Sequence, residues 1–218
     1  MRLLLLRHGQ THSNVSGALD TGAPGADLTD LGRAQADAAG TVLADRGIEA
    51  IYCSTLVRTQ QTAAPLAERL QLRPEALEAL REVRAGDLEM NTDEESALAY
   101  RHVVASWLLE GDLSQRMPGA ESGQEFLTRF DAAVEDIRTQ GHRTALIVSH
   151  GAAIRTWVGL HLAEDAAERW REQALQPLHN TGCIEVEYDD GWQVVAWHNL
   201  PVGGDLLDDP GAADPTAR

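Results

Sequence analysis

Short apolar runs alternate with longer amphipathic segments along the first part of the chain. Residues 3–6 are four consecutive leucines, which is typical of a strand covered on both faces. Residues 29–47 place apolar side chains at helical spacing after a capping threonine and end in a glycine. Residues 48–54 and 55–72 repeat strand and helix, with Pro65 predicting a kink or break near the middle of that helix. This alternation predicts a parallel sheet.

The pattern of the opening strand recurs later in the chain. Residues 143–151 form another apolar run that ends in a polar pair and a glycine, and residues 152–162 continue as a helix. Residues 181–199 alternate apolar and polar side chains around Asp190 and Gly191, which predicts a hairpin. We therefore expect an α/β fold: a three-layer α/β/α sandwich with a mostly parallel central sheet and one antiparallel edge strand.

The region between these parts predicts two helices with different places in the fold. We expect residues 121–139 to pack on the sheet, whereas residues 84–120, which include the helical stretch 92–109, are expected to form a small helical lid insertion. Apolar side chains of this region either contact a substrate or simply pack a helix pair, and they are Met90, Tyr100, Trp107, Leu108, Leu109 and Met117. Residues 201–218 are rich in Gly, Pro, Ala and Asp and predict a disordered tail.

Composition narrows the class of protein. A chain of 218 residues with 43% hydrophobic content can cover one core, so residues 1–200 predict a single domain. The net charge of -16 disfavours binding to nucleic acid or to an anionic membrane, since both need a basic surface. Cys53 and Cys183 lie in apolar segments without metal-ligand spacing, which predicts two buried thiols. The run before Arg7 is too short for a signal peptide and no run reaches membrane-spanning length, so we expect a cytoplasmic protein.

Basic side chains follow two of the predicted strands. Arg7 and His8 come directly after the first apolar run, and His150 comes after the run that begins at residue 143. Because ligands collect at the carboxyl ends of strands in an open parallel sheet, we expect the two imidazoles to converge on one site. The Arg7 guanidinium suits phosphate oxygens there. The histidines without this context are expected to be structural or surface residues: His12, His102, His142, His161, His179 and His198.

Five motifs follow one another along the chain: RHGQTHSN, LTDLGRAQA, CSTLVRTQQTA, LREVRAGDLE and VSHGAAIR. In this order and spacing, over about residues 2–200, they resemble the histidine phosphatase superfamily, also called the phosphoglycerate-mutase-like family. The resemblance implies a phosphohistidine mechanism in which His8 is the nucleophile and Glu82 the proton donor. The residues that it implies for holding the phosphoryl group or lining the pocket are Arg7, Arg58, His150, Asn14 and Thr11. In GDLEM, Leu88 and Met90 stand where family members often have tryptophan and glycine.

The chemistry of phosphoryl transfer explains these residue types on its own terms. Charge spreads over three equatorial oxygens, so that catalysis is mostly positioning and stabilisation by cations such as Arg7, Arg58 and His150. A neutral His8 has a lone pair to attack phosphorus, and Glu82, protonated through burial, can supply the proton that an alkoxide needs. No metal or other cofactor is required. The expected partner is a small phosphorylated metabolite, and a homodimer is compatible with the sequence.

Several functions remain open at this point. Residues 91–116 are mostly acidic where they are charged, which disfavours a doubly anionic glycerate, so a phosphomonoester hydrolase is preferred over a cofactor-dependent phosphoglycerate mutase. An inactive scaffold that binds a protein partner is the alternative outside enzymes. A metallohydrolase would use His8, His12, Glu82 and His150, but the loop predicted around Gly9 and Gly17 removes the helical spacing of the first two.

Overall fold

The computed structural model describes residues 1–161, 170, 172–209, 211–212 and 215. The strands are β1 (Arg2–Arg7), β2 (Ala50–Ser54), β3 (Glu75–Leu77), β4 (Thr144–Ser149), β5 (Cys183–Tyr188) and β6 (Trp192–His198). The α-helices are α1 (His12–Ser16), α2 (Asp30–Leu43), α3 (Val57–Leu70), α4 (Glu94–Leu109), α5 (Gly123–Thr139) and α6 (Gly151–Leu160). Three short 3-10 helices are η1 (Glu78–Leu80), η2 (Gly86–Leu88) and η3 (Asp205–Leu207).

The strands form one mixed sheet in the order β3-β2-β4-β1-β5-β6. From β3 to β1 each strand runs parallel to its neighbour, whereas β5 runs antiparallel to β1 and β6 antiparallel to β5. The predicted mostly parallel sheet is confirmed, and its antiparallel edge is the β5–β6 hairpin. The register pairs Arg7 with Ser149, so the residues that follow β1 and β4 leave the sheet side by side.

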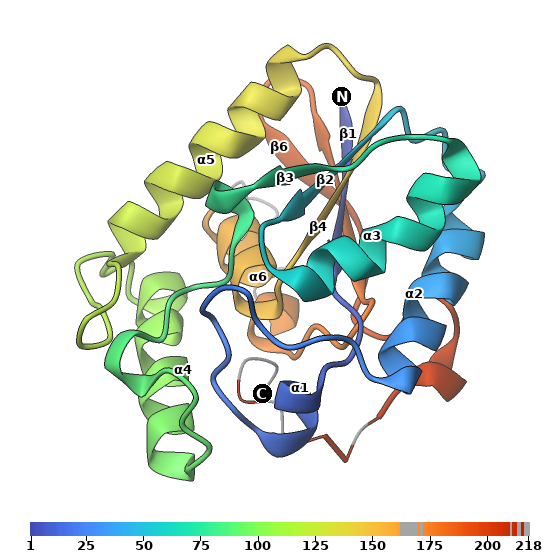
Figure 1. Ribbon diagram of the computed structural model, residues 1–218. Coiled ribbons are helices and arrows are strands. Elements are labelled where there is room, and N and C mark those ends of the chain that lie inside the picture. Colours follow the sequence, from blue (N-terminus) through green and yellow to red (C-terminus); the bar gives the residue numbers. More distant parts are fainter. Residues whose placement is uncertain (162–169, 171, 210, 213–214, 216–218) are drawn as a thin grey trace.

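The four leucines of β1 contribute to two separate cores. Leu3 and Leu5 face a cluster that includes Phe126, Phe130 and Trp157 of α5 and α6. Leu4 and Leu6 face the opposite cluster, built with residues of α2 and α3. Alternate side chains of a strand point to opposite faces, which is why an unbroken apolar run is needed here. Figure 1 shows α2 and α3 on one side of the sheet and α5 and α6 on the other, which confirms the three-layer sandwich.

Two local predictions differ from the structure. Helix α3 runs continuously through Pro65 instead of breaking there. Its apolar face, with Ala63 and Leu66, is buried against the sheet, and this burial offsets the roughly 3 kcal/mol that an interior proline costs. The expected loop after Gly9 also contains the short helix α1, which is capped by Thr11 and ends at Gly17 with a φ of 76°. Because α1 begins at His12, the first two histidines still do not share a helix.

Helix α4 of the predicted lid packs against the body of the domain. Tyr100, Val104 and Trp107 are buried in the same core as α5 and α6, and Met117 of the following loop joins them. The Trp107 indole N–H donates to Gln115 O at 3.0 Å. These side chains therefore pack helices together. The function of residues 84–120 as a lid stays a prediction.

The described part of the expected tail is ordered. Although its composition predicts disorder, residues 201–209 return to the domain and contain η3. Three of its groups accept hydrogen bonds, at 2.7, 2.7 and 2.8 Å, from Gln35, His179 and Gln10. The carbonyl of Leu207 and the carboxylates of Asp208 and Asp209 thus find partners that replace an apolar core. Most of residues 210–218 lie outside the described part.

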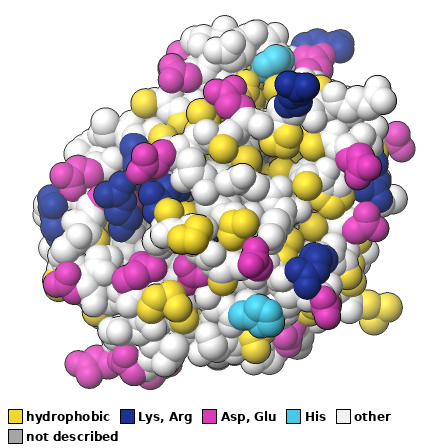
Figure 2. Space-filling model, in the orientation of Figure 1, with side chains coloured by type: hydrophobic (Ala, Val, Ile, Leu, Met, Phe, Trp, Pro, Cys, Tyr) yellow, Lys and Arg dark blue, Asp and Glu magenta, His cyan; other side chains and the backbone are white. Residues whose placement is uncertain are grey.

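The surface and the cysteines agree with the composition. Figure 2 shows acidic side chains interspersed with arginines and apolar groups across one face of the molecule. Cys53 and Cys183 are free and buried, as predicted, and burial raises the pKa of Cys53 to about 11 and that of Cys183 to about 12. Within the described residues, no helix combines the length and the apolar character that crossing a membrane requires.

Candidate active site

Four strand ends deliver side chains to one edge of the sheet. His8 follows β1 and His150 follows β4, and both side chains are buried. Ser54 ends β2, while Arg58 lies in the first turn of the helix after it. Because these strands are parallel neighbours, their carboxyl ends meet, and the His8 and His150 ring centroids lie 5.2 Å apart at an angle of 63°. The predicted convergence of the two imidazoles is present.

The hydrogen bonds of His8 determine which of its nitrogens has a lone pair. Nδ1 lies 2.7 Å from Gly9 O, which can only accept, so Nδ1 bears the hydrogen. Arg58 Nε, which can only donate, lies 3.1 Å from His8 Nε2. The ring is therefore neutral, with the Nε2 lone pair directed at Arg58. Burial, and then the charges of Arg58 and Arg7, hold the pKa of His8 well below its usual range, which keeps this form dominant.

The loop after His8 is fixed by close backbone packing. A Cβ at Gly9 would lie 2.5 Å from Gly32 O at the start of α2, so a glycine is needed where these segments cross. The Gly9 amide donates to Thr62 Oγ1 of α3 at 2.9 Å. Thr11 and Asn14 of the next turn form a capping box, and Asn180 Nδ2 donates to both His8 O and Asn14 Oδ1. The nucleophile candidate thus stands on a rigid support.

His150 is the N-cap residue of α6 and is completely buried. Its Nε2 lies 2.8 Å from Ser54 Oγ, and that hydroxyl also lies 3.0 Å from Thr59 Oγ1. His150 Nδ1 has no hydrogen-bond partner among the described residues. Burial, followed by the Arg58 charge, holds the pKa of His150 well below its usual range. A buried ring nitrogen of this kind is available to an oxygen of a bound group.

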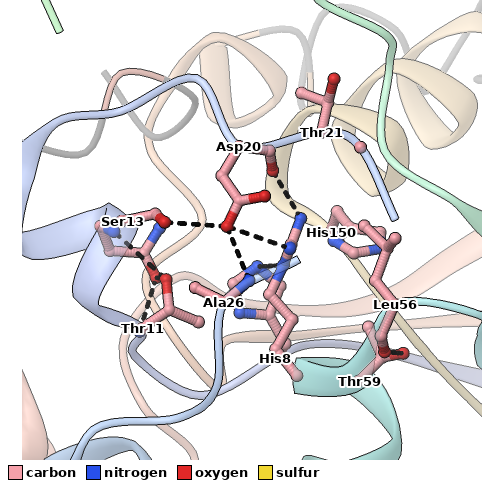
Figure 3. A network of polar contacts seen from close by, with 12 residues as sticks. His8, Thr11, Ser13, Asp20, Thr21, Ala26, Leu56, Thr59 and His150 are labelled. Carbon is pink, nitrogen blue, oxygen red and sulfur yellow. Dashed lines mark hydrogen bonds and ion pairs between the residues drawn. The ribbon is translucent and has the colours of Figure 1, made fainter. Parts of the chain in front are cut away.

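Two arginines provide the positive charge of the site. Arg7 at the end of β1 donates to Leu178 O at 2.6 Å. Arg58 donates to Asp20 O at 2.8 Å, and its Nη1 lies 3.6 Å from Asp20 Oδ2. Figure 3 shows Asp20 reaching from its loop toward His8, with its carboxylate bonded to Ser13 and to the Ala26 amide. A carboxylate therefore lies beside the guanidinium that contacts the nucleophile candidate.

Glu82 reaches the site from the irregular segment between η1 and η2. Its Oε1 accepts from the amides of Val83 at 2.9 Å and Ala153 at 2.7 Å, and its Oε2 accepts from Ala152 at 3.2 Å. The last two amides belong to the first turn of α6. Burial raises the pKa of Glu82, against the opposing effects of these hydrogen bonds and of Arg58 and Arg7. A buried carboxyl with a raised pKa can hold a proton near neutrality.

A narrow pocket brings these groups together. Its lining residues are His8, Thr11, Ser13, Asn14, Ala18, Asp20, Arg58 and Glu82. Five of the seven predicted residues line it, and the other two, Arg7 and His150, lie close enough for their charges or rings to act on His8. Sequence reasoning missed Ser54, whose position at a strand end was the available signal. It also missed Asp20 and Ser13, for which the sequence pattern gives no comparable signal.

The described residues hold no cluster of three or more His, Cys, Asp or Glu side chains arranged to bind a metal ion. His12, a possible ligand in the metallohydrolase hypothesis, is exposed on α1 instead of pointing into the pocket with His8. The residues of the pocket are thus arranged as one nucleophile candidate, a set of cations and one buried carboxyl.

Comparison with known proteins gives one family and several relatives. The model of the histidine phosphatase superfamily (branch 1) matches residues 3–200. A Mycobacterium tuberculosis protein named PE-PGRS family protein PE_PGRS11 is 33% identical over 213 residues, which cover 91% of this chain but 36% of that longer protein. The probable phosphoglycerate mutase GpmB of Escherichia coli is 32% identical, with 96% of each chain covered. The structure of a mycobacterial glucosyl-3-phosphoglycerate phosphatase in complex with VO3 is similar with a TM-score of 0.75 at 26% identity, covering 90% of this chain and 98% of that one.

Proposed function

The chain belongs to the histidine phosphatase superfamily, and from this membership we propose that it hydrolyses a small phosphate monoester through a phosphohistidine on His8. The observation that carries the proposal is the state of the His8 ring, with Nδ1–H on Gly9 O and the Nε2 lone pair facing Arg58. A solved relative is named as a phosphatase of a sugar-linked phosphoglycerate, which supports hydrolysis of a phosphorylated metabolite.

In the first half-reaction His8 Nε2 attacks phosphorus as the bond from phosphorus to the ester oxygen breaks. Arg58 turns its N–H groups from His8 and Asp20 to the phosphoryl oxygens, where Arg7 and His150 also stabilise charge. Glu82 gives its proton to the departing alkoxide. Its Oε2 accepts one hydrogen bond from the described residues whereas Oε1 accepts two, so Oε2 has more room for that proton.

In the second half-reaction water attacks the phosphorus of the phosphohistidine. The Glu82 carboxylate takes a proton from that water, the bond between nitrogen and phosphorus breaks, and its electron pair returns to Nε2. Inorganic phosphate leaves and the resting hydrogen bonds re-form. This sequence balances without a metal ion, so metal independence is part of the proposal. A reducing, cytoplasmic location is also part of it because Cys53 and Cys183 are both unpaired.

Hydrolysis of 4-nitrophenyl phosphate at about pH 5 to 7, with a chelator present, tests this function. We expect activity that falls by at least about 10³-fold in His8→Ala, a scale typical of losing a covalent nucleophile. The matched control is His12→Ala, which changes a neighbouring exposed histidine and should keep full activity. Vanadate, a mimic of the pentacoordinate transition state, should inhibit strongly. Turnover that survives in His8→Ala, or that chelation removes, would overturn the proposal.

A mutase remains the second candidate because a relative covering 96% of each chain is named a probable phosphoglycerate mutase. The acidic residues 91–116 disfavour a doubly anionic glycerate. Adding 3-phosphoglycerate with 2,3-bisphosphoglycerate decides between the two enzymes. Isomerisation that outpaces phosphate release identifies the mutase, and a folded protein inactive on every phosphate ester identifies a scaffold.

A further inference from the structure

The backbone around Glu82 is held by side chains from other elements instead of by its own secondary structure. Five successive carbonyls, from residue 79 to residue 83, each accept a hydrogen bond from a distant side chain. The donors, at 2.7 to 3.0 Å, are Arg129 for Ala79, Arg81 and Glu82, Ser149 for Leu80, and Tyr100 for Val83. A segment of irregular backbone with every carbonyl engaged in this way has one position open to it.

Arg129 of α5 makes most of these contacts. Its Nη1 donates to Ala79 O at 2.7 Å and to Arg81 O at 2.9 Å, and its Nη2 donates to Glu82 O at 2.9 Å. Nε and Nη2 also form a bidentate pair with Glu121, at 2.8 and 2.6 Å. These five bonds use all five donors of the guanidinium.

Glu121 completes the arrangement from the opposite side. Its side chain is 7% exposed, and its Oε1 also accepts from the amide of Arg84 at 3.3 Å. Arg129 packs over the Phe126 ring, 4.9 Å from the centroid. The buried pair thus binds the chain on both sides of Glu82 and joins it to the rigid helix α5.

We propose that Arg129, together with Glu121, is a positioning residue for proton transfer by Glu82, a proposal that rests on the proposed function. The Glu82 side chain leaves a backbone fixed by Arg129 and ends on the amides of α6, so the carboxyl bridges two rigid supports. A proton donor must lie within hydrogen-bond reach of the leaving oxygen, and a misplacement of about 1 Å costs on the order of 10²-fold in rate.

The test compares two substrates that differ in their need for a proton. Nitrophenolate leaves readily as an anion, whereas an alkyl alkoxide must be protonated as it departs. We measure kcat/KM for 4-nitrophenyl phosphate and for glycerol 2-phosphate, because this quantity covers the steps up to loss of the alcohol. In Arg129→Gln we expect a loss of about 10- to 100-fold for the alkyl ester and of about threefold or less for the aryl ester.

Two further variants make the result specific. Arg138→Gln removes an exposed arginine from the same helix and should change neither substrate. Glu121→Gln keeps Arg129 but weakens the pair, and should reproduce the same selectivity with a smaller loss. It also provides the measurement if Arg129→Gln does not fold. Equal losses for both substrates in the folded variants would overturn the positioning role and leave Arg129 with structure alone.

Glu82→Gln separates this proposal from the proposed function. A selective loss for the alkyl ester in Glu82→Gln, without one in Arg129→Gln or Glu121→Gln, rejects the positioning role and keeps Glu82 as the acid. A Glu82→Gln variant with equal losses rejects the acid assignment itself, and the positioning role with it. A selective loss in all three variants supports both.

Discussion

The two halves of the site are built by different means. The half with His8 and His150 is placed by the sheet, since the register between β1 and β4 sets the distance between the residues that follow them. The half with Glu82 is placed by side-chain hydrogen bonds to an irregular segment, chiefly from Arg129. Strand pairing repeats along many residues and tolerates the loss of one contact. A segment without its own ladder depends on each donor.

The pH profile separates the halves most strongly. Activity needs His8 neutral and Glu82 protonated; because the pKa of His8 is lowered and that of Glu82 raised, this form dominates between the two values. Activity on an alkyl phosphate should fall with rising pH as Glu82 loses its proton. In Glu82→Gln that alkaline fall should disappear, together with about 10²- to 10⁴-fold of the rate at the optimum. Substrate ionisation is common to both proteins, so a fall that persists unchanged in the variant contradicts the assignment.

Arg58 tests the sheet-placed half. Arg58→Ala should lower kcat/KM by about 10²- to 10³-fold, the scale of removing one donor to a developing anion. The loss should be similar for aryl and alkyl phosphates, since both transfer the same phosphoryl group. Arg33→Ala is the control because Arg33 is exposed and pairs only locally, with Asp30 and Leu28 O. Equal losses in the two variants would mean that Arg58 does not touch the phosphoryl group.

Tyr100→Phe gives the smallest effect and tests whether the carbonyl donors of the Glu82 segment act together. The variant leaves Val83 O, which is buried, without the hydroxyl that lies 3.0 Å away. We expect a loss of about 1–3 kcal/mol in the free energy of unfolding, the usual cost of an unsatisfied buried carbonyl. Activity on an alkyl phosphate should fall by less than about tenfold, because Arg129 still fixes the neighbouring carbonyls. Thermal unfolding and kcat/KM measure the two effects, with Tyr188→Phe on β5 as the control.

The same division explains what the sequence could predict. The leucines before Arg7 and the apolar run before His150 are local patterns, and the rule that parallel strands end at one edge brings their followers together. Motif resemblance added Glu82, but no local pattern indicated that Arg129, 47 residues later, fixes it. Long-range side-chain bonds leave no periodic trace in a sequence.

The wrong predictions have a related cause. Pro65 predicted a break in its helix, yet burial of one face keeps α3 continuous. The composition of residues 201–209 predicted disorder, yet their carboxylates and carbonyls bond to Gln10, Gln35 and His179. In both cases local preference was overridden by contacts with distant parts of the fold, which composition and propensity do not encode.

Asp20 gives the resting pocket an occupant of its own. Its carboxylate lies 3.6 Å from Arg58 and accepts hydrogen bonds from Ser13 and the Ala26 amide. A singly charged visitor gains little by exchanging places with an equal charge already seated there, whereas a dianion gains more from the same guanidinium. The loop thereby discriminates among solutes by valence before any chemistry begins, and it can refill the vacancy as each phosphate ion departs.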